Sequence, residues 1–199
     1  MSRALESVAM RRFTVEDYHR MAEKGILGPD EQVELVRGVI REMSPKNWAH
    51  VIAAKSVYDL LLDALRGKAS VYPEAPLVAD AIDSEPQPDV LVCSNPDEWA
   101  YGSRRTNPLL VIEISDSSLQ YDLGEKASLY AEAGVPEYWV VNLVERVLVV
   151  FREPLKGSYQ VRLSLEETKR VTPEPWPGLT LEVSAFFPPE RHDPSDEGR

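Results

Sequence analysis

Two acidic residues and one lysine stand where this sequence could assemble a hydrolytic site. Asp89 opens one apolar run, and Glu113 lies near the end of a second. Lys126 follows four residues after Asp122, in a segment that predicts a helix. Two carboxylates on neighbouring strands and a nearby ammonium are the groups with which a protein can hold Mg²⁺ against a phosphodiester and prepare a water molecule for attack.

The spacing of the two acids suggests how they could meet. If residues 89–92 and 109–114 form antiparallel strands, Asp89 and Glu113 lie nearly opposite each other. Two carboxylates that close repel each other, and a bound cation removes that conflict. A charge that ends an apolar run is costly unless it is paired or binds metal. An aspartate after a proline is often only a turn residue, so the spacing alone leaves a metal site and a structural role as equal alternatives.

Lys126 has two interpretations. It shares one face of the predicted helix with Asp122, because residues four apart are neighbours on a helix. If that face turns toward the strand ends, the ammonium can stabilise an attacking hydroxide or the charge of the transition state. The two residues by themselves favour the alternative, an exposed ion pair worth about 0.3–0.5 kcal/mol.

The elements that must position these side chains follow from apolar periodicity, caps and turn residues. In the longest predicted helix, Val51, Ala54, Tyr58, Leu61 and Leu65 have the spacing of a buried face. The sequence predicts helices over residues 14–24, 47–66 and 119–133, a hairpin over residues 33–43 around Arg37 and Gly38, and strands over residues 70–72, 76–78, 89–92, 109–114, 138–141, 147–152, 159–163 and 179–183.

The order of these elements predicts an α/β (α+β) fold, in which a mixed β-sheet is flanked by helices. We expect one domain over residues 1–187, with its core at about residues 47–142. An N-terminal helix and hairpin precede this core, and a β extension follows it. Residues 188–199 are polar and charged, and we expect them to form a mobile tail.

Composition excludes several classes of protein. The net charge of -11 argues against a general nucleic-acid coat protein, because binding to phosphates is driven by basic surface. The single Cys93 excludes a disulfide framework and a cysteine-based zinc site. The chain has neither a long apolar span nor a secretory signal, so we expect a cytoplasmic protein that does not contact membranes. A local basic patch for DNA could still form from Arg11, Arg12, Arg37, Arg41, Lys46, Arg104 and Arg105.

Several stretches of the sequence resemble a known family. The resemblance covers nearly the whole chain, and residues 113–142 carry its most specific part. The family that the chain resembles is the Uma-two family of restriction endonucleases, which belongs to the PD-(D/E)XK nuclease superfamily. The matching stretches are residues 33–38, 44–45, 88–89, 111–118, 122–126, 130–142 and 176–179, together with His50.

The resemblance implies a restriction-endonuclease-like core and a metal-dependent endonuclease that hydrolyses DNA phosphodiester bonds with Mg²⁺ or Mn²⁺. Asp89 and Glu113 would bind the ion, together with the backbone carbonyl of Ile114. Lys126 would be the lysine of the motif and would position the nucleophile. Asp122, one helical turn before it, is a possible accessory residue.

Three further accessory residues follow from the same resemblance. Glu34 looks like the extra acid that these proteins bring from their N-terminal part. His50 matches a position where the family often has histidine, with a structural role at the helix terminus as the alternative. The superfamily usually has its lysine two residues after the glutamate, where this chain has Ser115. The Uma-two branch resembles relatives whose lysine has moved to the following helix, which fits Lys126.

Two alternative functions would use the same residues differently. A catalytically inactive nuclease-fold module that binds DNA or a protein partner fits the acidic charge and Ser115. A glycoside hydrolase would also use paired acids, but it has no use for Lys126. A homodimer suits a nuclease that makes staggered double-strand cuts. Trp176, Phe186 and Phe187 could form its interface, with core packing as the alternative.

Overall fold

The structure, a computed structural model, describes residues 10–94 and 108–189. The chain forms two compact units, one made of Met1–Met43 with Val78–Pro86 and the other of Ser44–Leu77 with Gln87–Arg199. The single domain expected over residues 1–187 stays a prediction. Arg104, Arg105 and most of the expected tail lie outside the described residues.

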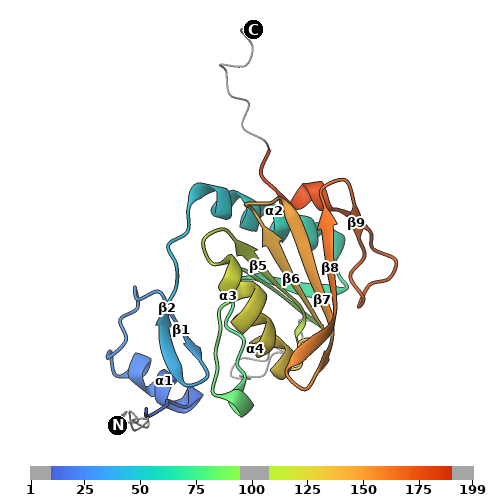
Figure 1. Ribbon diagram of the computed structural model, residues 1–199. Helices are drawn as coiled ribbons and strands as arrows, with labels where there is room; N and C mark the ends of the chain where they lie inside the picture. The colour runs from blue at the N-terminus through green and yellow to red at the C-terminus, as the bar shows by residue number, and fades with distance from the viewer. Residues whose placement is uncertain (1–9, 95–107, 190–199) are drawn as a thin grey trace, which may run out of the picture. The chain divides into compact units, whose positions relative to one another are not determined.

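The N-terminal unit contains the predicted helix and hairpin (Figure 1). Thr14 caps the helix by accepting a hydrogen bond from the backbone N–H of Asp17, and the Asp17 side chain accepts one from the Thr14 N–H. Arg37 and Gly38 both have positive φ, 50° and 73°, as a tight two-residue hairpin turn requires. The elements of this unit are α1 (Val15–Glu23), β1 (Val33–Val36), β2 (Val39–Glu42) and η1 (Asp80–Ile82).

The second unit is built on one six-stranded sheet, in the order β3-β4-β5-β6-β7-β8. Strands β5 and β6 are parallel, and the other neighbouring pairs are antiparallel. This mixed sheet, flanked by helices, confirms the predicted fold class. Its strands are β3 (Ala69–Pro73), β4 (Val90–Ser94), β5 (Pro108–Ser115), β6 (Glu137–Asn142), β7 (Val147–Leu155) and β8 (Ser158–Glu166).

Helices cover both faces of this sheet (Figure 1). On one face, α2 (Trp48–Ala64) buries Ala53, Val57 and Leu61 against alternate residues of the central strands. On the other face lie α3 (Leu119–Tyr121), the π-helical turn η3 (Asp122–Lys126) and α4 (Ala127–Glu132). Because both faces are covered, β5 and β6 are apolar over nearly their whole length, with few exceptions such as Glu113.

One expected strand is wrong, and the expected face of one helix is confirmed only in part. Residues 76–78 form no strand, although Leu77 is buried, because burial of an apolar side chain does not require a sheet partner. On the face expected for α2, Leu61 and Leu65 are buried and Ala54 and Tyr58 pack against the core, whereas Val51 is 42% exposed. This helix carries apolar residues around most of its circumference, so its sequence fits more than one buried face.

The end of the chain differs from its prediction as well. The strand expected over residues 179–183 is reduced to β10 (Leu181–Glu182), which pairs with β9 (Arg170–Val171) and is followed by η4 (Val183–Phe186). Phe186 and Phe187 are buried in the hydrophobic core, and Trp176 packs against that core. These aromatic side chains therefore do not form the exposed interface proposed for them. No helix in the described part of the chain is long and apolar enough to cross a membrane.

Candidate active site

Strand pairing brings Asp89 and Glu113 together. The expected antiparallel pairing of β4 with β5 is confirmed, with Val90 opposite Ile112, so the residues that come next on each side are Asp89 and Glu113. The backbone N–H of Asp89 donates to Glu113 Oε2 at 3.3 Å, and the N–H of Ile114 donates to Asp89 Oδ2 at 2.8 Å. Both residues are buried, at 6% exposure.

Glu113 is held by two side chains from the other face of the sheet. Lys126 Nζ donates to Glu113 Oε1 at 3.0 Å, and the Tyr130 hydroxyl donates to the same oxygen at 2.6 Å. The lysine and the tyrosine lie four residues apart along η3 and α4, and so on one face of the helical segment. Lys126 is therefore a buried partner of the strand glutamate rather than one half of an exposed ion pair.

Asp89 is held in a similar way from the side of α2. Lys46 Nζ and His50 Nε2 each lie 2.9 Å from Asp89 Oδ1. An ionised carboxylate only accepts hydrogen bonds, so His50 Nε2 carries a proton in this contact. Lys46 also donates to Glu74 Oε1 at 2.7 Å. Each acid therefore contacts a lysine and also a ring-bearing residue, and in both cases the ring-bearing residue follows that lysine by four positions in the sequence.

His50 also has the structural role that the sequence left open. Its backbone N–H donates to the side chain of Asn47, which caps α2. The amide of Asn47 donates in turn to Asp116 Oδ2 at 2.6 Å, just after β5. This bond ties the beginning of α2 to the end of the strand that carries Glu113, and so fixes the direction of the His50 ring.

The remaining predicted residues divide into two groups. Asp122 Oδ2 accepts hydrogen bonds from the Ser115 and Ser118 hydroxyls, at 2.6 and 2.5 Å. Ser115, at the position usual for the superfamily's lysine, therefore contacts Asp122, while Lys126 reaches Glu113 from the following helix. Glu34 lies on β1 in the N-terminal unit, and its accessory role stays a prediction.

Sequence reasoning missed part of this constellation. Lys46 was expected only in a basic patch, and Tyr130 and Glu74 were not expected at all. The four-residue spacing of Lys46 from His50, repeated by Lys126 and Tyr130, is a signal that could have indicated two of these residues. Nothing in the local sequence indicates Glu74, because its contact with Lys46 depends on tertiary packing.

The two acids have opposite protonation tendencies. Burial raises the pKa of Asp89, but the hydrogen bond from His50 and the charges of His50 and Lys46 together bring it below its ordinary value. Burial raises the pKa of the Glu113 carboxyl to about 8, against the opposing effect of the Lys126 ammonium. The negative charges of Asp89 and Asp122 raise it further. At neutral pH, Asp89 is therefore ionised and Glu113 tends to keep its proton.

Burial and nearby charges also shift the pKa values of two neighbouring groups, Asp122 and Lys46. Burial raises the pKa of Asp122, and the hydroxyls of Ser115 and Ser118 reverse only part of that effect. Burial alone would lower the pKa of Lys46, but the negative charges of Asp89 and Glu74 raise it above its ordinary value. Lys46 is therefore a cation at neutral pH.

The donor set fits a small, hard cation. Mg²⁺ is held by one or two carboxylates and completes its shell with water and substrate oxygens, and Asp89 and Glu113 supply that number. The N–H of Ile114 points at Asp89, and in an extended strand the carbonyl of the same residue points to the same side, as its expected role as a ligand requires. Within the described residues, no three histidine, cysteine or acidic side chains gather into a metal cluster. An ion held here would therefore rely on water and phosphate oxygens as well.

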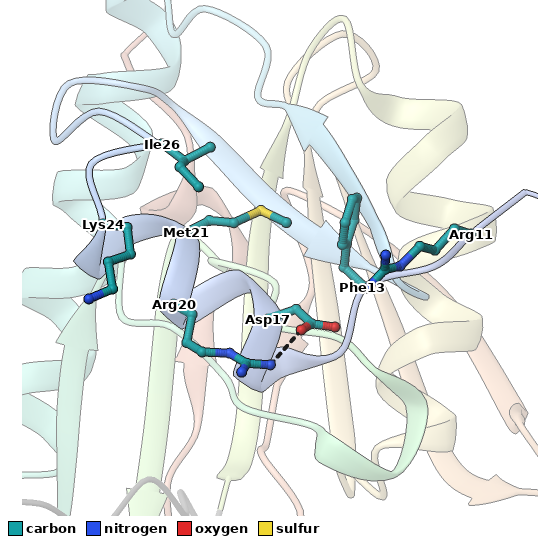
Figure 2. Close-up of a pocket in the computed structure, with 7 residues that line it drawn as sticks. All are labelled: Arg11, Phe13, Asp17, Arg20, Met21, Lys24 and Ile26. Carbon is teal, nitrogen blue, oxygen red and sulfur yellow. Dashed lines mark hydrogen bonds and ion pairs between the residues drawn. The ribbon is translucent and has the colours of Figure 1, made fainter.

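A separate depression lies in the N-terminal unit (Figure 2). It has a volume of about 310 Å³, and its lining includes Phe13, Met21 and Ile26. Arg11 and Lys24 stand at it without an ion-pair partner among the described residues. Arg20 pairs with Asp17 at 2.7 Å. Two residues of the basic patch predicted from the sequence lie in different places: Arg11 lines this depression, and Lys46 contacts Asp89 in the candidate active site.

Comparison with known proteins agrees with this architecture. The fold is shared with the crystal structure of a putative nuclease belonging to DUF820 from Anabaena variabilis, with a TM-score of 0.71 and 16% sequence identity. The match covers 88% of this chain and 97% of that one. The mixed sheet and its flanking helices thus have the same fold as that protein.

The sequence itself identifies the family. The model of the Uma2 family, described as "Putative restriction endonuclease", matches residues 15–184. The chain therefore belongs to the Uma2 family, as the resemblance in its sequence predicts. Comparison with curated proteins gives no significant match.

Proposed function

We propose that this protein is a metal-dependent endonuclease that hydrolyses phosphodiester bonds of DNA. The observation that carries the proposal is the pair of buried carboxylates, Asp89 directly before β4 and Glu113 on the adjacent β5, with the Lys126 ammonium 3.0 Å from the glutamate. Family membership supports the same reaction class.

Each residue has a role that follows from its contacts. Asp89, Glu113 and the carbonyl of Ile114 would hold Mg²⁺ or Mn²⁺. When bound, the cation supplies polarisation of the phosphodiester and greater acidity of a water molecule. Lys126 orients the attacking water and stabilises the charge that develops on the phosphate. Tyr130 keeps the Glu113 carboxylate in place, because its hydroxyl donates to the oxygen that Lys126 contacts.

The partners belong to the proposal as well. DNA is the expected substrate, and the net charge of -11 means that it must be bound by local groups of cations. Arg11 and Lys24, at the depression in the N-terminal unit, supply two such cations. The homodimer and the cytoplasmic location stay predictions from the sequence.

A plasmid assay tests the reaction. Supercoiled DNA is incubated with the protein and with Mg²⁺, Mn²⁺ or Ca²⁺, and nicked product is measured over time. We expect nicking with Mg²⁺ and Mn²⁺, and a loss of roughly a hundredfold or more in Asp89→Asn and Lys126→Met. Asp63→Asn is the matched control, because Asp63 is exposed on α2 and pairs only with Arg66 among the described residues. Nicking that survives in both site variants, or no nicking with any ion, would contradict the proposal.

One observation favours the alternative of an inactive module. Each acid already contacts an ammonium, Asp89 that of Lys46 and Glu113 that of Lys126, so both acids have a cationic partner without a divalent ion. An inactive module needs no ion. Calorimetric titration with Mn²⁺ separates the two functions, because the nuclease must bind the ion in the wild type and lose that binding in Asp89→Asn.

A further inference from the structure

Lys46 is a second lysine at the acids, and its setting differs from that of Lys126. The Lys126 side chain is 6% exposed and the Lys46 side chain 30% exposed. Lys126 comes from a packed helical segment. Lys46 comes from residues 43–47, which form neither a helix nor a strand before α2 begins. The Lys46 side chain can therefore turn away from the Asp89 carboxylate, whereas the Lys126 side chain cannot turn away from Glu113.

The contacts of Asp89 leave little room for another cation. A carboxylate offers about four lone-pair directions. At Asp89, Lys46 and His50 share Oδ1, and the N–H of Ile114 takes one direction at Oδ2. A divalent ion placed between Asp89 and Glu113 would also bring two positive charges close to the Lys46 ammonium. Of the three donors, Lys46 is the one that can leave, since Ile114 is fixed in β5 and His50 in α2.

Among the acids that the structure describes, Lys46 contacts only one besides Asp89, and that acid would hold the departing ammonium weakly. Its other partner is Glu74, whose side chain is 58% exposed, and ion pairs to such groups are weak. A phosphate oxygen beside the cation is the strongest acceptor that this position would offer, because a phosphodiester carries a negative charge. His50 remains on Asp89 Oδ1 and keeps the carboxylate oriented.

We propose that Lys46 and the divalent cation exchange at Asp89: Lys46 neutralises the carboxylate in the metal-free protein and binds the substrate phosphate once the cation is in place. This inference rests on the proposed function and deepens it. It assigns to Lys46 a contact with substrate, distinct from that of Lys126. It also predicts that metal binding and Lys46 oppose each other when DNA is absent and cooperate when DNA is present.

The first experiment measures the metal without DNA. Calorimetric titration of Mn²⁺ into wild type, Lys46→Met and Lys55→Met gives three affinities. Lys55 is the control because it lies on α2, is exposed and pairs with Asp59. We expect Lys46→Met to bind Mn²⁺ about tenfold tighter than wild type, because a competing positive charge is gone, and Lys55→Met to be unchanged. A residue that only orients Asp89 would give weaker binding on substitution, and that result, or equal affinity, overturns the inference.

The second experiment measures DNA. Binding of a short duplex is followed in Ca²⁺ at several salt concentrations. We expect Lys46→Met to weaken binding about tenfold and to reduce the salt slope by about one. Lys46→Arg should restore the slope, because it keeps the charge. A Lys46→Met protein with the affinity and slope of Lys55→Met overturns the contact with phosphate.

The two proposals fail in different ways. A wild type that binds neither Mn²⁺ nor the duplex overturns the proposed function and this inference with it. A wild type that binds both, with Lys46→Met indistinguishable from Lys55→Met, overturns only the role of Lys46. If Lys46→Met does not fold by circular dichroism, Lys46→Gln, which keeps a polar donor, takes its place in both experiments.

Discussion

Burial sets the protonation state of Glu113. Its pKa is raised to about 8, chiefly by burial, whereas Asp89 at the same site has a lowered pKa. A pair with one proton is the expected state of two close carboxylates without a metal. A cation that binds between them must displace the proton on Glu113, because a protonated carboxyl is a poor ligand.

This protonation predicts a pH-dependent metal affinity. Below pH 8 the folded protein holds the Glu113 proton, so Mn²⁺ competes with it, and the affinity should rise about tenfold per pH unit between pH 6 and 8. Titration calorimetry in buffers with different ionisation enthalpies should detect close to one proton released per ion at pH 6. Asp89 adds nothing to this slope because it is already ionised. An affinity independent of pH in that range would contradict the raised pKa of Glu113.

At the scale of elements, hydroxyls of two tyrosines tie strands to the helical segment on one face of the sheet. The Tyr138 hydroxyl on β6 donates to the carbonyl of Asp122 at 3.1 Å, at the beginning of the π-helical turn. The Tyr159 hydroxyl on β8 donates to the carbonyl of Val135 at 2.9 Å, just after α4. A π-helical turn disturbs the regular helical hydrogen bonds, so an outside donor at Asp122 helps to satisfy the backbone. These bonds help to position Lys126.

The same tyrosines predict a loss of stability in alkali. Burial raises the pKa of both phenols above the ordinary value of 10.0. Above pH 10 the unfolded chain loses these protons and the folded protein keeps them, so the free energy of unfolding falls as pH rises, by up to about 1.4 kcal/mol per pH unit for each tyrosine.

Urea unfolding between pH 9 and 11 measures this dependence. Tyr159→Phe should be less stable than wild type at pH 8, by about 1 kcal/mol, because it lacks the hydrogen bond to Val135. Its stability should decline less steeply above pH 10, since one titrating phenol is gone. Equal slopes in the two proteins would show that Tyr159 is not protected in the folded state.

At the scale of the whole molecule, net charge limits how the proposed DNA substrate could bind. With a net charge of -11, the proposed binding of DNA would rely on isolated cations such as Arg11 and Lys24, at the depression in the N-terminal unit (Figure 2). Attraction between these cations and phosphates is screened by salt. Affinity for DNA should therefore fall steeply with ionic strength despite the acidic surface.

A double substitution tests the contribution of these two cations. Arg11→Ala with Lys24→Ala should weaken duplex binding in Ca²⁺ and reduce the salt slope by about two, since two phosphate contacts are lost. Arg66→Ala is the control, because Arg66 is an exposed cation on the other unit that pairs with Asp63. If the control and the double variant lose the same affinity, the depression has no special part in binding.

The sequence alone determined most of the elements and the principal residues of the candidate site. Alternation, caps and turn residues act over a few positions, so the hairpin around Gly38, α2 and the strands that carry Asp89 and Glu113 could be predicted from local spacing. The antiparallel pairing of β4 with β5, which the sequence indicated only as a condition for bringing the two acids together, is present in the structure. The family resemblance added Lys126, which spacing alone had left as a surface ion pair.

Only the tertiary structure decided which groups complete the site. Lys46 and His50 contact Asp89 across 43 and 39 positions of the chain, and Tyr130 reaches Glu113 across 17. Such contacts depend on how helices pack on both faces of the sheet, which local periodicity does not encode. The π-helical turn and the burial of Phe186 likewise involve contacts with residues that are distant in the chain.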